Sequence, residues 1–326
     1  MKFQLETPRA VEEAKNSQKG LNWALELLIF VAVFLVVSIG ESIILLPVEL
    51  YLMFTNETYM SAIAAGDIQL AMTAATEITS SHVYTIGMLF ANIAIILIVI
   101  LFCKLIQKRK MSTLGFVKKG MGKEYGLGLL AGFVFFSAAV LLCVVTGTLE
   151  ITGLSETFSW GVFILFALGF MIQGMAEEVL CRSYFMVSIA RRYPIWLAVL
   201  LNALFFAALH LGKSGISVLA FLNLVLFGIF ASVYFIKRGS IWGIGAFHSI
   251  WNFVQGNFYG IKVSGIETSC SVFESLSAEG GTLMNGGNFG LEGGLGVTIV
   301  FVVGIIILLC IPAKNQEKVV EGQAES

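Results

Sequence analysis

Long apolar stretches separated by short polar segments repeat along the chain. Eight stretches approach the roughly 20 mostly apolar residues that a membrane-spanning helix needs. They cover residues 22–47, 84–106, 126–147, 159–188, 194–212, 215–236, 240–257 and 295–312. The first is too long for the core of a signal peptide, so we interpret it as a retained helix. The pattern predicts an all-α protein, a polytopic transmembrane bundle with about eight spans.

Basic residues are concentrated in alternate connections between these stretches. Of the 20 Lys and Arg residues, 17 fall in the two tails and in every second connection, two fall in the remaining connections, and Arg182 lies inside a span. Loops rich in Lys and Arg stay in the cytoplasm. This distribution predicts that both termini are cytoplasmic and that the chain is a multi-pass protein of the cell membrane.

The composition agrees with a lipid environment, and the spans and charges together predict how the chain is organised. Hydrophobic residues make up 57% of the sequence and charged residues only 13%, and the net charge of -1 gives no reason to expect nucleic acid as a partner. We expect a cytoplasmic tail (1–20), two N-terminal transmembrane helices with their loops (21–124), a catalytic transmembrane core (125–257), a flexible Gly-rich outer loop (258–294), a last transmembrane helix (295–312) and a second cytoplasmic tail (313–326).

Several ionisable residues interrupt the apolar spans, where each charge costs free energy and usually has a partner or a function. Glu178 and Arg182 are four residues apart in the fourth predicted span, so they share a helix face and can form a pair. Glu177 points about 100° away from Glu178. We therefore expect Glu177 to face a wet cavity. Glu41, in the first span, has no role assigned by the sequence.

Two histidines can join Glu177 from neighbouring helices. His210 and Glu177 are equally far from the predicted turn at Tyr193 and Pro194, about 16 residues or roughly 25 Å, so an antiparallel hairpin brings them to the same height. Phe206 lies one turn before His210 and can orient its ring. His248 and Asn252 share a face of the seventh span. The sequence predicts that these groups converge.

A carboxylate, two imidazoles and a carboxamide around one cavity suit amide hydrolysis. Glu177 can act as the general base toward water, with His210 holding the same water. His248 and Asn252 can donate hydrogen bonds to the oxyanion. Alternatively, Glu177, His210 and His248 can bind Zn²⁺ and leave one position open for water. At the level of the sequence both mechanisms stay open.

The patterns Glu-Glu-x-x-x-Arg, Phe-x-x-x-His and His-x-x-x-Asn follow one another on successive helices within residues 125–256. In this order they resemble the CPBP family of intramembrane peptidases (CAAX proteases and bacteriocin-processing enzymes, also called Abi or Rce1-like). The resemblance implies that Glu177, His210, His248 and Asn252 are catalytic and that Glu178 and Arg182 support them. It also implies a membrane-anchored peptide or protein substrate, either a prenylated CAAX-type peptide or one like a bacteriocin or pheromone.

Two other functions fit the polar spans. Intramembrane Glu and His residues also suit a proton-coupled transporter, although no paired, broken helices recur in two halves of the chain. A catalytically silent membrane protein, for example an immunity or scaffold protein, would keep its full effect after substitution of Glu177. Hydrolysis that depends on Glu177 would separate the peptidase from both.

Overall fold

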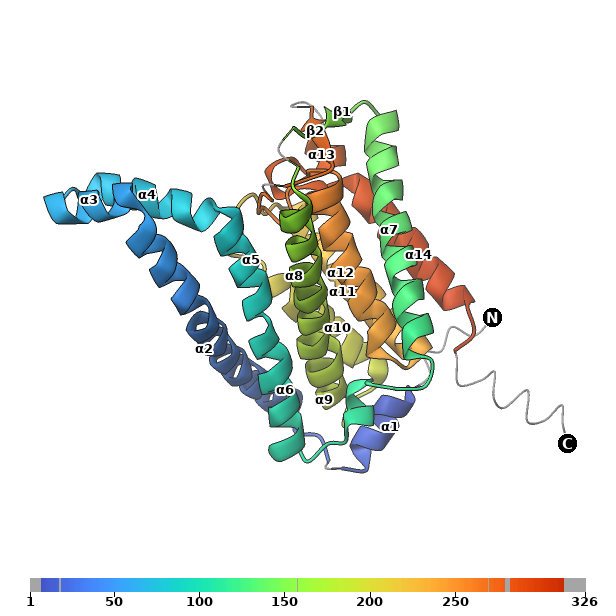
Figure 1. The fold of residues 1–326 in the computed structure, drawn as a ribbon. Coiled ribbons are helices and arrows are strands. Elements are labelled where there is room, and N and C mark those ends of the chain that lie inside the picture. The colour runs from blue at the N-terminus through green and yellow to red at the C-terminus, as the bar shows by residue number, and fades with distance from the viewer. Residues whose placement is uncertain (1–6, 18, 157, 269, 279–281, 314–326) are drawn as a thin grey trace, which may run out of the picture.

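The computed structural model describes residues 7–17, 19–156, 158–268, 270–278 and 282–313. In this part of the chain the architecture is a bundle of long helices, which confirms the prediction of an all-α polytopic membrane protein (Figure 1). Five helical segments are long and apolar enough to cross a membrane, namely Trp23–Thr55, His82–Leu105, Met121–Val145, Trp160–Ala190 and Val218–Arg238, and two shorter apolar helices are Ile195–Ala208 and Leu295–Cys310. The number of spans and the side of the termini stay predictions; residues 1–6 and 314–326 lie outside the described residues.

The N-terminal half begins with the short helix α1 (Arg9–Lys15) and the long helix α2 (Trp23–Thr55). It continues through α3 (Glu57–Ala65), α4 (Ile68–Ser80), α5 (His82–Ala91) and α6 (Ile93–Leu105). Helices α2 to α5 each start at a residue whose side chain accepts a hydrogen bond from the first turn, namely Asn22, Asn56, Asp67 and Ser81. In Figure 1, α2 leans away from the other helices, and α3 and α4 extend sideways from its far end.

The second half forms the body of the bundle, with α7 (Met121–Val145), α8 (Trp160–Glu178), α9 (Val187–Ala190), α10 (Ile195–Ala208), α11 (Val218–Arg238), α12 (Ile241–Phe253) and α14 (Leu295–Cys310). Helix α12 packs against both α7 and α8. The approach to α7 needs glycine, because a Cβ on Gly128 would lie 2.1 Å from the Gly243 carbonyl oxygen. Small residues allow such close packing of membrane helices.

Helix α8 continues without a break into a π-helical segment, Val179–Met186, and then into α9. Every residue of this π-helical segment is buried. A π-helical turn inserts extra backbone into a helix and often occurs at functional sites. Here it begins directly after Glu178.

The two ends of the bundle differ in charge and structure. We call the end formed by α1 and the C-terminal ends of α6, α9 and α11 the basic end, because Arg191, Arg192, Lys237 and Arg238 lie there. The opposite end, the sheet end, carries β1 (Leu149–Leu154), β2 (Phe273–Ser277) and α13 (Thr282–Asn285), as Figure 1 shows. The two strands pair in antiparallel fashion, with an irregularity between Ile151 and Gly153.

Part of the Gly-rich segment 258–294, which the sequence predicts to be a flexible outer loop, is packed against the protein in the described residues. Phe289 and Leu291 are almost fully buried. Gly286 and Gly290 have positive φ, and a Cβ on Gly290 would lie 2.0 Å from the Lys262 carbonyl oxygen. The glycines therefore permit tight backbone packing here. Residues 269 and 279–281 lie outside the described part of this segment.

Candidate active site

Glu177 and Glu178 end helix α8 and face different surroundings. Glu178 is completely buried, whereas 22% of the Glu177 side chain is exposed. Consecutive residues on a helix point about 100° apart, so the pair cannot share one environment. Glu178 points into the protein interior, and Glu177 lines a cavity.

Glu178 holds two cationic or potentially cationic groups. Its Oε1 accepts a hydrogen bond from Arg182 Nη1 at 3.0 Å and another from His248 Nδ1 at 2.9 Å. The predicted Glu178–Arg182 pair is therefore present, with both side chains fully buried. The Arg182 guanidinium also lies over the ring of Phe206, 4.6 Å from its centroid. This arrangement gives the buried charge of Arg182 a carboxylate and an aromatic partner.

The contact with Glu178 defines what His248 can do in the cavity. Because its Nδ1–H donates to Glu178, the other ring nitrogen, Nε2, faces Glu177 and lies 3.8 Å from Oε2 of that residue. In the neutral ring Nε2 carries a lone pair. Nε2 can donate a hydrogen bond only when the ring carries a proton on both nitrogens.

Gln173 connects Glu177 to Asn252 and was not identified from the sequence. Its Nε2 donates to Glu177 Oε1, and its Oε1 accepts a hydrogen bond of 2.9 Å from Asn252 Nδ2. Gln173 lies four residues before Glu177, on the same face of α8. An amide one helical turn from a carboxylate in an apolar span was therefore the sequence feature that could have identified Gln173. The three side chains form one chain of hydrogen bonds.

His210 lies just beyond the end of α10. Its Nδ1–H donates to the Phe206 carbonyl at 2.8 Å, which leaves Nε2 as the acceptor in the neutral ring. The Phe206 ring lies against it, with the centroids 4.9 Å apart. Among the described residues, Glu177 is not a hydrogen-bond or ion-pair partner of His210, so the expected meeting of the two side chains takes the form of a shared cavity.

Gly174 explains why α12 can present His248 and Asn252 so close to α8. A Cβ at this position would lie 2.4 Å from the backbone nitrogen of Ser249. Real Cβ atoms do not approach backbone that closely, so any side chain would push the helices apart. The absence of a side chain at Gly174 thus positions the imidazole of His248 beside the two glutamates.

The cavity between these groups has a volume of about 450 Å³ and is lined by apolar side chains with a few polar groups. Gln173, Glu177, His210, His248 and Asn252, which we call the Glu177 cluster, all line it. Glu41 of α2, left without a role by the sequence, lines it too, as do Lys213 and Glu292. Apolar walls with a few convergent polar groups are typical of ligand sites.

Zinc ligation by Glu177, His210 and His248 does not match this geometry. Among the described residues, no three His, Cys, Asp or Glu side chains are grouped closely enough to hold one metal ion. His248 also uses Nδ1 for Glu178, so only its Nε2 is available to a ligand in the cavity. A metal requirement stays a prediction, which titration with a chelator and Zn²⁺ tests.

Comparison with known proteins adds one match. Residues 159–254 match the family model described as "Type II CAAX prenyl endopeptidase Rce1-like". This region runs from the start of α8 to the end of α12 and contains all seven predicted site residues, Glu177, Glu178, Arg182, Phe206, His210, His248 and Asn252. No curated protein and no solved structure gives a significant match to the chain.

Proposed function

We propose, from the premise that residues 159–254 form an Rce1-like domain, that the chain is an intramembrane endopeptidase in which Glu177 activates water. The family match supports a CAAX-type endopeptidase in general terms. One observation carries the proposed role of Glu177. Its carboxylate has one oxygen held by Gln173, while the other faces the cavity 3.8 Å from His248 Nε2.

The first step is attack by water on the peptide carbonyl. We expect the water to lie between Glu177 Oε2 and His210 Nε2, which is available because Nδ1 donates to Phe206. Glu177 takes one proton from the water as the oxygen attacks the carbonyl carbon. Gln173 fixes the carboxylate through its other oxygen, so the basic lone pairs stay directed at the cavity.

The second step is collapse of the tetrahedral intermediate. Its oxyanion accepts hydrogen bonds from Asn252 Nδ2, which has a second N–H beyond the one donated to Gln173, and from the imidazolium of His248. Glu177 then gives its proton to the leaving amine as the C–N bond breaks. The carboxylate is thereby restored and the two peptide products are released.

Glu178 contributes by holding His248 in the required state. Its carboxylate accepts from Nδ1 and so keeps the ring oriented with Nε2 toward the cavity. Arg182 donates to the same oxygen of Glu178 and adds a second positive charge beside the two glutamates. The four groups Glu177, Glu178, Arg182 and protonated His248 then sum to zero, which limits the cost of burying them.

Substitution of Glu177 tests the proposal. Purified protein in liposomes is offered a library of membrane-anchored and lipid-modified peptides, and products are identified by mass spectrometry. We expect Glu177→Gln to lower the cleavage rate about 10²–10⁴-fold while the melting temperature stays unchanged. Glu150→Gln, an exposed position on β1, is the matched control and should keep full activity. Cleavage by Glu177→Gln at the wild-type rate would refute the role of Glu177.

Metal dependence is tested on the same preparation. Because no three potential ligands among the described residues lie close enough together to hold one ion, we expect prolonged dialysis against a chelator to leave the cleavage rate unchanged. Loss of activity that Zn²⁺ restores would instead assign a metal to the site.

A further inference from the structure

The cavity is built from the parts of the helices near the sheet end. Helix α11 contributes Asn223 and Leu224, close to its start at Val218, and α14 contributes Val297, close to its start at Leu295. Connections at the sheet end also line it, with Val263, Ser264, Ile266, Thr268 and Glu292. None of the connections at the basic end, residues 106–120, 191–194 and 239–240, supplies a lining residue.

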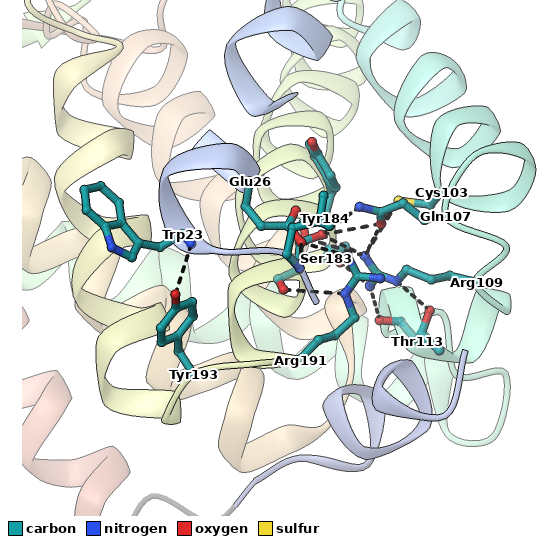
Figure 2. Close-up of polar contacts among 12 residues, drawn as sticks. Trp23, Glu26, Cys103, Gln107, Arg109, Thr113, Ser183, Tyr184, Arg191 and Tyr193 are labelled. Atoms are coloured by element: carbon teal, nitrogen blue, oxygen red, sulfur yellow. Dashed lines mark hydrogen bonds and ion pairs between the residues drawn. The ribbon is translucent and has the colours of Figure 1, made fainter. Parts of the chain in front are cut away.

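A second buried polar cluster, shown in Figure 2, lies toward the basic end, where the connection after α6 meets the π-helical segment. We call Gln107, Arg109, Thr113, Ser183 and Ser188 the Arg109 cluster. Arg109 Nη2 donates to the carbonyl oxygens of Ser183, at 2.8 Å, and Thr113, at 2.9 Å. Burial lowers the pKa of Arg109 to about 10, so the guanidinium is still charged at neutral pH. This cluster joins the connection after α6 to the π-helical segment.

A second contact at the same end ties α2 to α9. Glu26 Oε1 lies 3.0 Å from Arg191 Nη2, with both side chains almost fully buried, and the backbone N–H of Trp23 donates to the Tyr193 hydroxyl at 3.4 Å (Figure 2). These contacts and the buried π-helical segment fill the basic end of the bundle, where none of the described connections lines the cavity.

The walls near the sheet end are more polar and less covered. Ser38, Glu41 and Ser42 line the cavity from α2. Thr268 and Glu292 line it from the sheet-end connections. We therefore expect a peptide to reach Glu177 from the sheet end.

Basic residues indicate which side of the membrane the sheet end faces. Connections rich in Lys and Arg stay in the cytoplasm. The basic-end connections 106–120 and 191–194 hold seven Lys and Arg residues, whereas the sheet-end connections 146–159, 209–217 and 258–294 hold two. The sheet end then faces away from the cytoplasm.

We propose that the cavity opens to the non-cytoplasmic side, so that the chain cleaves membrane-anchored peptides whose scissile bond lies in the non-cytoplasmic half of the bilayer. The cleavage in this inference rests on the proposed function, whereas the position of the opening does not. A substrate of this class has an anchor in the membrane and a cleavable segment that emerges on the outer face. A lipid-modified C-terminus presented from the cytoplasm would have to pass the Arg109 cluster to reach Glu177.

Cysteine labelling tests the opening without any measurement of activity. Ser42→Cys and Thr268→Cys place thiols on two walls of the cavity, and Lys119→Cys places one on the exposed connection before α7, at the basic end. Each variant is expressed in bacterial cells and treated with a membrane-impermeant maleimide, either in intact cells from which the outer membrane has been removed or in inverted vesicles. The wild-type chain gives the background from the native cysteines, four of which are buried.

We expect Ser42→Cys and Thr268→Cys to be labelled several-fold above background in the cells, and Lys119→Cys only in inverted vesicles. Samples denatured before labelling confirm that each thiol is present. Labelling of both cavity positions only in inverted vesicles, or of neither from outside, would overturn the inference, and so would labelling of Lys119→Cys from outside. Outside labelling without peptide cleavage would leave the opening in place and reject the proposed function.

Discussion

Two buried polar clusters share the continuous helical rod from α8 to α9, which carries Gln173 and Glu177 of one cluster and Ser183 and Ser188 of the other. They differ in how many of their polar groups have hydrogen-bond partners. In the Arg109 cluster the guanidinium is only 3% exposed, and all three of its nitrogens donate hydrogen bonds. In the Glu177 cluster the carboxylate is 22% exposed, and only one of its oxygens accepts a hydrogen bond from the described residues.

This difference separates a structural cluster from a reactive one. Buried polar groups whose partners are complete make the fold rigid, because each lost partner leaves a costly unsatisfied group. A catalytic group needs an unused lone pair directed at space that a substrate can enter. Helix α8 and its π-helical extension carry both kinds within a few turns, so substitutions along one rod should divide into effects on stability and effects on rate.

Glu178 has both a structural and a catalytic role, so its substitution should have the largest effect. Glu178→Gln removes the carboxylate from Arg182 and His248 together. We expect unfolding to become easier by about 3–5 kcal/mol, because Arg182 is left as an uncompensated buried charge. Peptide cleavage should also be lost, since His248 no longer has a negative partner. Glu177→Gln, the same chemical change one residue earlier, should lose only cleavage. Thermal unfolding in detergent and a peptide assay measure both; equal stability of the two variants would contradict the distinction.

Arg109→Met should affect stability alone. The carbonyl oxygens of Thr113 and Ser183 would lose their donor inside the protein, at about 1–3 kcal/mol for each unsatisfied group. We expect a markedly lower melting temperature and an unchanged cleavage rate per folded molecule. Lys110→Met, at the exposed neighbouring position, is the control and should change neither. A slower folded enzyme with normal stability would place the Arg109 cluster in the catalytic machinery.

Gln173→Leu should affect rate alone, and less than Glu177→Gln. Loss of the amide frees both the Glu177 carboxylate and the Asn252 side chain, and misplacement of catalytic groups by about 1 Å can cost about 10²-fold in rate. We expect kcat to fall and the melting temperature to hold, because Gln173 is only partly buried. Gln69→Leu, an exposed position on α4, serves as the control. Unchanged kcat would show that Glu177 needs no fixed orientation.

The sequence predicted the elements whose signal is local. The eight apolar stretches all coincide with helices, because length and hydropathy determine which segments enter lipid, and the Glu178–Arg182 pair follows from helical spacing. Gln173 was missed because an uncharged amide in a span gives a weaker signal than a charge. The π-helical segment and the place of Glu41 at the cavity depend on how distant helices pack, which hydropathy does not encode.

The smallest effect should come from α1, which docks on the basic end outside the membrane. A hydrogen bond from the Ser112 hydroxyl, together with one from Arg9, lowers the pKa of Glu13. The pKa of the Glu13 carboxyl is lower in the folded state than its ordinary value of 4.5, so the contact stabilises the fold at pH values above 4.5. This contribution is lost as the pH falls below that value and the carboxylate is protonated. Glu13→Gln should remove about 0.5 kcal/mol near neutral pH, the scale of a partly exposed pair. Its unfolding curve should meet that of the wild type in acid, whereas Glu12→Gln, exposed on the same helix, should follow the wild type throughout. A difference that persists in acid would mean that Glu13 acts through packing and not through charge.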